Sequence, residues 1–506
     1  MEYPFQGVLD GQADSTRHRL SENSLLGETS SDGSRRPAQE TVSEKDASAT
    51  DLEVGSNGSG ASTGETTGVE DVADPFGSAE NAQVKYRTMK WFHVGILLVA
   101  ETVSLGILSL PSAMAAVGFV PGVLLIAGMG AMATYTGYVI FQVRMRYPQV
   151  HSFSDVAQLM FGRVGREIIE VAQVLVFVFI MAAHILTFSY MMNTLSRHAT
   201  CTIVFSVVGT ILSFMLTLPR KLQDISYISV FSCLSIVTAV VVAMVAMGIS
   251  KPGVGDNFPV VPYNLTSFPK AILAVSNITI AYAGHVAFFG FISELQQPRD
   301  FPKALAQLQI TAITLYVVVA VVIYYFAGQK VASPALGSAS PIVRKIAYGI
   351  ATPTIVVAGV INASVAAKNI YVRLWRGLGK KEVMSEKSFR ARASYWAICA
   401  GLWIVAFIIA EAVPVFNNLL GLIGALLCSW FCYGFSAMFW LWMNRNGYTK
   451  SWKKIALTCL NVGIFCFAVS ICGLGLYATS KAIHDDPSGA SFSCADTRSP
   501  TEKLTG

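Results

Sequence analysis

A single carboxylate lies inside the first long apolar stretch of the chain, Trp91 to Val117 (WFHVGILLVAETVSLGILSLPSAMAAV). Glu101 is near its middle, and Gly106 and Pro111 follow. An ionised side chain at the centre of a membrane helix costs about 3 kcal/mol. Gly and Pro weaken the helical hydrogen bonds, and the backbone groups set free need a ligand, water or protein partner. A helix that breaks at mid-depth beside a carboxylate is typical of a transporter substrate site.

A second interrupted stretch runs from Ser267 to Pro298, with Ala281–His285 (AYAGH) near its middle. If each stretch opens a half of five spans, the two hold matching positions and run in opposite directions, as in inverted-repeat transporters. We expect one central site where the breaks meet. Free N–H groups and positive helix ends there would bind a substrate carboxylate, and freed carbonyls its ammonium group. The third, sixth, eighth and tenth apolar runs, at about residues 167–192, 269–292, 344–367 and 416–441, would enclose the substrate side chain.

The ionisable residues each allow two interpretations. Glu101 is the first candidate for proton coupling or for holding the ammonium group, since intramembrane acids are functional by default. The alternative is a neutral Glu that fixes helix packing. His285, at the expected second break, could relay the proton or donate to the substrate, and a packing role is equally open. His184, in the third span, is interpreted as a packing residue.

Other polar residues are candidates for ion binding or modification. Asn362 and Ser364, in the eighth span, could hold a sodium ion, although interhelical hydrogen bonding is the commoner role. Asn264 begins the one usable glycosylation sequon. The nine cysteines lie almost all in apolar runs and show no metal-ligand spacing in a polar context. We interpret them as packing residues, and expect neither a disulfide framework nor a metal site.

The composition excludes an ordinary soluble protein. Of 506 residues, 53% are hydrophobic and 13% charged, and the mean hydropathy is +0.52. These values predict an all-α polytopic membrane protein. Residues 1–84 differ, with 16 of the 31 acidic residues but only five of the 37 Lys and Arg, and predict a disordered acidic cytoplasmic tail. A transporter domain over residues 85–480 and a short extracytoplasmic tail over 481–506 complete the predicted organisation.

Eleven apolar runs are long enough to cross a bilayer. They cover approximately residues 91–113, 119–143, 167–192, 199–218, 225–249, 269–292, 304–328, 344–367, 393–413, 416–441 and 454–479. With the N-terminus inside, the inner loops carry twenty Lys and Arg and the outer loops six. This asymmetry follows the positive-inside rule, and it supports both the count and the orientation.

Several segments, in the same order, resemble signatures of the amino acid/auxin permease family. These segments are Gly106–Pro111 (GILSLP), Phe153–Ala157 (FSDVA), Phe161–Gly165 (FGRVG), Ala281–His285 (AYAGH), Ile292–Glu294 (ISE) and Pro298–Leu305 (PRDFPKAL). The resemblance covers about Lys90 to Tyr477. The segment Ala100–Pro111 (AETVSLGILSLP) is most similar to the corresponding segment of neutral amino acid permeases of filamentous fungi. Ser104 stands where the family usually has a Gly, so the accepted substrate size is expected to differ.

The resemblance implies a 5+5 inverted-repeat transporter fold, with helices 1 and 6 broken, and proton- or sodium-coupled uptake of small neutral amino acids. The substrate site carried over from it comprises Glu101, Ser104, Leu105, Gly106, Ile107, Tyr282, Ala283, Gly284 and His285, with Glu101 and His285 as candidates for proton coupling. No cofactor is implied beyond a proton or sodium gradient.

The predicted function is therefore secondary active transport of neutral aliphatic or aromatic amino acids, by proton symport into the cytosol. Alternatives are an amino acid sensor built on a transporter fold and a vacuolar exporter. An enzyme is not expected, because no paired Asp and His cluster at one membrane face, and no ATP-binding motif is present. The predicted partners are the amino acid, the lipid bilayer and, through the tail, trafficking and ubiquitin machinery, but not nucleic acid. The plasma membrane is the expected location, with the vacuolar membrane as the alternative.

Overall fold

The computed structural model describes residues 89–219, 223–253, 267–379, 388–485 and 491–496, which are helical apart from short connections. One isolated parallel β-bridge joins Met89 to Leu295. The predicted tail over 1–84 and the sequon at Asn264 lie outside the described residues.

Two predicted spans are each divided into three helical segments. The first comprises α1 (Trp91–Thr102), the 3₁₀ turn η2 (Leu105–Leu108) and α2 (Leu110–Val117). The sixth comprises α7 (Phe268–Ala281), the 3₁₀ turn η3 (Ala283–Ala287) and α8 (Phe288–Glu294). Both interruptions fall where the sequence predicts a broken helix.

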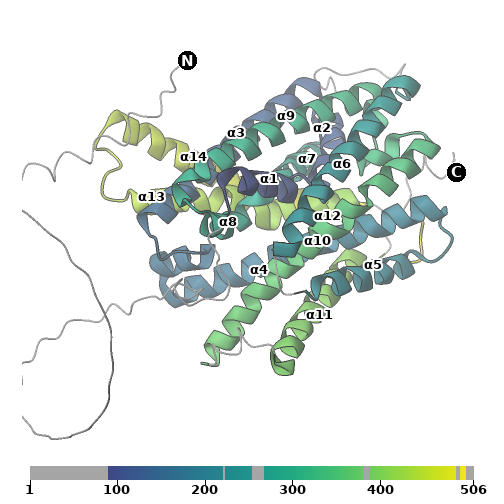
Figure 1. The fold of residues 1–506 in the computed structure, drawn as a ribbon. Coiled ribbons are helices and arrows are strands. Elements are labelled where there is room, and N and C mark those ends of the chain that lie inside the picture. Colours follow the sequence, from purple (N-terminus) through teal and green to yellow (C-terminus); the bar gives the residue numbers. More distant parts are fainter. Residues whose placement is uncertain (1–88, 220–222, 254–266, 380–387, 486–490, 497–506) are drawn as a thin grey trace, which may run out of the picture. The chain divides into compact units, whose positions relative to one another are not determined.

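Figure 1 shows the remaining α-helices, which vary widely in length. They are α3 (Phe119–Arg146), α4 (Phe153–Ser196), α5 (Thr202–Thr217), α6 (Gln223–Ser250), α9 (Phe301–Ala327), α10 (Pro341–Gly377), α11 (Phe389–Ala412), α12 (Phe416–Ile423), α13 (Phe435–Met443) and α14 (Trp452–Asp485). Two π-helical segments, η8 (Gly424–Cys428) and η9 (Trp430–Gly434), join α12 to α13. Short 3₁₀ turns are η4 (Pro298–Asp300), η5 (Gly328–Lys330) and η6 (Ala335–Ser338).

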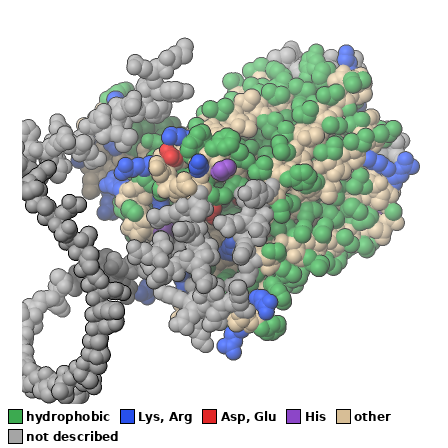
Figure 2. All heavy atoms as spheres, in the orientation of Figure 1, with side chains coloured by type: hydrophobic (Ala, Val, Ile, Leu, Met, Phe, Trp, Pro, Cys, Tyr) green, Lys and Arg blue, Asp and Glu red, His purple; other side chains and the backbone are tan. Residues whose placement is uncertain are grey.

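Nine helical segments of the described chain are long and apolar enough to cross a membrane, and α1 and α5 are shorter apolar helices. On the face in view in Figure 2, hydrophobic side chains cover most of the area not drawn in grey, and Lys and Arg lie mainly toward its margins. Apolar surface of this extent requires a lipid environment. The chain is therefore an integral, multi-pass membrane protein. The count of eleven spans and the 5+5 repeat stay predictions.

The third predicted span differs most from its expected bounds. The sequence predicts a start at residue 167, whereas α4 begins at Phe153, where the Ser152 hydroxyl accepts a hydrogen bond from the Asp155 N–H (3.1 Å). Gly162 adopts φ 71° and kinks this helix, a left-handed value that glycine reaches without steric cost. Charged residues such as Asp155, Arg163 and Arg166 interrupt the first turns of α4, so a search for apolar runs does not include them.

The helix packing brings distant parts of the chain together around α4 and α10. Helix α10 packs against α4 and α6, while α9 packs against α1 and α3. Helix α14 lies along α7 and the η8–η9 segments. The two broken spans consequently meet inside the helical assembly, with α4, α10 and α12 around them.

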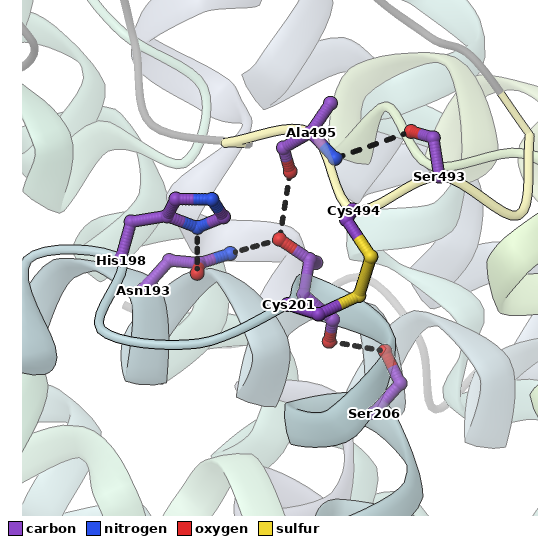
Figure 3. Close-up of a disulfide and its surroundings, with 8 residues drawn as sticks. Asn193, His198, Cys201, Ser206, Ser493, Cys494 and Ala495 are labelled. Atoms are coloured by element: carbon purple, nitrogen blue, oxygen red, sulfur yellow. Dashed lines mark hydrogen bonds between the residues drawn. A yellow bond between two sulfur atoms is a disulfide. The ribbon is translucent and has the colours of Figure 1, made fainter.

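A disulfide between Cys201 and Cys494 shows that the interpretation of all nine cysteines as packing residues is wrong. Figure 3 shows this bond tying the segment after α14 to the start of α5. The Thr202 hydroxyl also donates to the Ala495 carbonyl (2.7 Å). The Phe492 N–H donates to the Glu411 carbonyl at the end of α11 (3.2 Å). The two cysteines are 293 positions apart, and sequence spacing gives no sign that they meet.

Candidate functional site

The two helix breaks approach each other closely because each places a glycine against the other helix. A Cβ added to Gly106 would lie 2.6 Å from the Cα of Ala281, the last residue of α7. A Cβ added to Gly284 would overlap the hydroxyl of Thr102, the last residue of α1. Any larger residue at either position would push the breaks apart.

Tyr316 of α9 holds both interrupted helices through one hydroxyl group. Its oxygen lies 3.0 Å from the Thr102 carbonyl and 2.8 Å from the Ala281 carbonyl, and the side chain is fully buried. These are the carbonyls at the ends of α1 and α7, which have lost their helical partners. Two of the carbonyls that we expected to bind a substrate ammonium group therefore already have a partner within the protein.

A cavity of about 50 Å³ lies between the two breaks. The residues that line it are Glu101, Thr102, Ser104, Leu105, Gly106, Ile180, Ala183, His184, Ile280, Ala283, Asn362 and Leu420. They belong to the two broken spans, α4, α10 and α12, which include the helices expected to enclose a substrate. The volume is sufficient for a few water molecules in this arrangement.

Glu101 is the one carboxylate in this lining. It is partly buried. Within the described residues, no hydrogen bond or ion pair joins its side chain to another group. A carboxylate without a protein partner in such a place is free to bind a cationic group or a proton.

Six of the expected site residues line the cavity: Glu101, Ser104, Leu105, Gly106, Ala283 and Asn362. The others, Ile107, Tyr282, Gly284, His285 and Ser364, do not.

The expected residues that lie outside the cavity bond to neighbouring backbone. The Tyr282 hydroxyl donates to the Ile126 carbonyl (2.8 Å). His285 is fully buried, with Nε2 2.9 Å from the Ala133 carbonyl and 3.0 Å from the Thr136 hydroxyl. Ser364 donates to the carbonyl of Val360 in its own helix (2.9 Å).

Several cavity residues were not expected from the sequence. They are Thr102, Ile180, Ala183, His184, Ile280 and Leu420. A histidine at the middle depth of a span was the one available signal, and we interpreted His184 as packing. The apolar residues resemble every other apolar residue of their helices, so no local pattern could have singled them out.

His184 is held by α10 and faces the first break. Its Nδ1 lies 2.8 Å from the Ile355 carbonyl, and its Nε2 lies 3.5 Å from the Ser104 hydroxyl. A Cβ on Gly359, one turn after Ile355, would lie 3.0 Å from the Cβ of His184. The absence of a side chain at Gly359 thus allows α4 to approach α10 at the depth of the cavity.

A larger groove of about 510 Å³ lies between α3 and α14. It is lined by Leu124, Leu125, Gly128, Met129, Met132, Cys459, Leu460, Gly463, Ile464 and Phe467. Such a lining offers no charge or amide to a zwitterion, so the smaller cavity is the better candidate for an amino acid.

A family model described as transmembrane amino acid transporter protein matches residues 87–481. The N amino acid transport system protein of Neurospora crassa is 34% identical over 422 residues, which cover 82% of this chain and 89% of the relative.

Two solved structures share the arrangement of the helices. The inward-facing conformation of Mhp1 aligns with a TM-score of 0.53 and 12% identity, over 81% of this chain and 95% of that structure. MhsT in complex with L-phenylalanine aligns with a TM-score of 0.52 and 10% identity, over 78% of this chain and all of that structure. At these identities the likeness concerns the fold.

Proposed function

Because the chain belongs to the transmembrane amino acid transporter protein family, we propose that it carries small neutral amino acids into the cytosol by proton-coupled symport with alternating access. One observation carries this proposal. The cavity between the two interrupted helices contains an unpaired carboxylate, Glu101, within the described residues. A site at the breaks can be exposed to one side of the membrane and then to the other by movement of the half-helices.

The division of the cavity into a polar and an apolar part supports a neutral substrate. Glu101, Ser104 and His184 supply the polar part, whereas Ile180 and Leu420 are among the apolar residues. A zwitterion would place its charged groups at the breaks and its side chain against the apolar wall. A second charge on the side chain would find no partner there, and the small volume favours short aliphatic side chains.

We assign proton coupling to Glu101 because this residue lines the cavity. His285 stays a second candidate, although its ring nitrogens lie near backbone carbonyls outside the cavity lining. For sodium, Asn362 reaches the cavity, but its amide donates to the Ala358 carbonyl (2.8 Å) and Ser364 bonds within its own helix. Both bonds use hydrogen-bond donors and leave the side-chain oxygens able to ligate an ion, so the preference for the proton rests on Glu101.

The disulfide supports the orientation with the N-terminus in the cytosol. Disulfides persist in oxidising compartments. The start of α5 and the segment after α14 would then both face away from the cytosol, as the charges of the loops also indicate. We propose the plasma membrane as the location, and a vacuolar exporter would have the same orientation relative to the cytosol.

The test is uptake of radiolabelled neutral amino acids into proteoliposomes under separately imposed pH and sodium gradients. We expect the pH gradient to drive accumulation, and Glu101→Gln to abolish it while exchange of preloaded substrate continues at saturating substrate, because the Gln amide keeps an oxygen acceptor at this position. Glu170→Gln, which changes a carboxylate of α4 outside the cavity lining, is the matched control. Sodium-driven accumulation would refute proton coupling, and saturable binding without flux would identify a sensor.

A further inference from the structure

Four backbone carbonyls at the breaks each accept a hydrogen bond from within the protein. The Thr102 and Ala281 carbonyls both meet the Tyr316 hydroxyl. The Tyr282 carbonyl accepts from the Gly284 N–H (2.9 Å), and the Gly106 carbonyl accepts from the Ser109 N–H (3.1 Å). An ammonium ion carries three donors and needs acceptors, so the side chains of the cavity become the next source.

His184 offers such an acceptor, because its other nitrogen fixes the tautomer. Nδ1 lies 2.8 Å from the Ile355 carbonyl, which can only accept, so Nδ1 carries the proton. In the neutral ring, Nε2 is then left with a lone pair. That nitrogen is on the side of Ser104, in the lining of the cavity.

The position of the ring is fixed as well as its tautomer. His184 is 3% exposed and bonded to α10, and a Cβ at Gly359 would lie only 3.0 Å from the His184 Cβ. Across the same cavity, Glu101 supplies an unpaired carboxylate, within the described residues. The charged acceptor of Glu101, on α1, and the neutral acceptor of His184, on α4, therefore line the same cavity.

We propose that Glu101 and His184 form the ammonium subsite of the transporter, and that Nε2 of His184 accepts a hydrogen bond from the primary ammonium group of the substrate. This inference rests on the proposed function. His184 thereby determines specificity for α-amino acids over analogues that lack the ammonium group. It does not require that His184 take part in proton coupling.

Two substitutions separate this role from a packing role. In His184→Asn, the side-chain amide can still donate to the Ile355 carbonyl, as Nδ1 does, but does not reach the Nε2 position. In His184→Gln, the amide reaches the Nε2 position and can supply an acceptor there. A structural role would make the Asn variant the better replacement, whereas the ammonium subsite makes the Gln variant better.

The measurement is inhibition of radiolabelled L-alanine uptake by unlabelled L-alanine and by L-lactate, which has a hydroxyl in place of the ammonium group. Loss of one hydrogen bond to a charged group is expected to reduce the preference for alanine over lactate by about 10- to 100-fold in His184→Asn. His184→Gln should keep most of it. An unchanged preference in His184→Asn, or a lower one in His184→Gln than in His184→Asn, overturns the proposal.

Gly359→Ala provides a second test that replaces none of the residues lining the cavity. Its Cβ would lie 3.0 Å and 3.2 Å from the Cβ and Cγ of His184, so the ring must shift. We expect Gly359→Ala to lose part of the preference for alanine over lactate, but less than His184→Asn loses. Full retention of that preference in Gly359→Ala overturns the proposal, even if His184→Asn fails to fold. A wild type that accumulates no neutral amino acid refutes the proposed function instead.

Discussion

Tyr316→Phe removes one hydroxyl group and leaves the shape of the side chain unchanged. In the wild type this hydroxyl lies within 3.0 Å of the carbonyls that end both α1 and α7. The Thr102 carbonyl keeps a second donor, the Ser104 N–H at 3.1 Å. The Ala281 carbonyl loses the donor described for it, and a buried acceptor without a partner costs about 1–3 kcal/mol.

This loss of free energy destabilises the arrangement in which the two breaks lie together, because in that arrangement the Tyr316 hydroxyl bridges them. A cost of about 1–3 kcal/mol lowers the equilibrium constant for that arrangement, relative to those in which the breaks separate, by roughly 5- to 150-fold. Since the cavity lies between the breaks, we expect the initial rate of amino acid uptake, normalised to reconstituted protein, to fall about fivefold or more.

The assay is uptake into proteoliposomes, with Tyr325→Phe as the control. Tyr325 belongs to the same helix and is 61% exposed, so it undergoes the same chemical change away from the breaks. We expect its uptake to equal that of the wild type. Uptake by Tyr316→Phe within twofold of Tyr325→Phe would refute the view that the bridging hydroxyl positions the site.

Two further predictions follow from the contacts described above. Gly106→Ala should reduce uptake strongly, because its Cβ would overlap backbone of α7 at a cost of about 1–3 kcal/mol. The control, Gly290→Ala, should not reduce uptake, because its Cβ would have no atom within 4 Å. Equal uptake by the two variants would contradict the close approach of the breaks. Cys201→Ser and Cys494→Ser should each free one thiol that an impermeant maleimide labels on intact cells. Labelling only after permeabilisation would contradict the proposed orientation.

The interruptions in the two unusual spans could be predicted because they depend on local chemistry. A carboxylate, glycines and a proline inside an apolar run disturb a membrane helix wherever it packs. The residues that close the site depend instead on which helices become neighbours. Tyr316 and Leu420 belong to spans that read as ordinary apolar helices, and only the packing of α9 and α12 brings them to the breaks.

Dependence on long-range packing also explains why the sequence does not predict the Cys201–Cys494 disulfide or the place of His184 in the cavity lining. Cys201 and Cys494 pair because the segment after α14 returns to the start of α5, a long-range contact with no local signature. His285 lies at an expected helix break in the sequence, whereas His184 has no such neighbour and is interpreted there as a packing residue. The structure separates them, since α10 directs His184 to the cavity and α3 surrounds the Nε2 of His285.

The disulfide also gives the chain the connectivity of a covalent ring with an arm. The polypeptide from Cys201 to Cys494 closes on itself and contains α5 to α14, while α1 to α4 precede it. Glu101 and His184 reach the cavity from the arm, whereas Asn362 and Leu420 reach it from the ring. A single proteolytic cut anywhere in the ring therefore leaves one continuous molecule, and only a cut outside the ring, before Cys201 or after Cys494, releases a fragment.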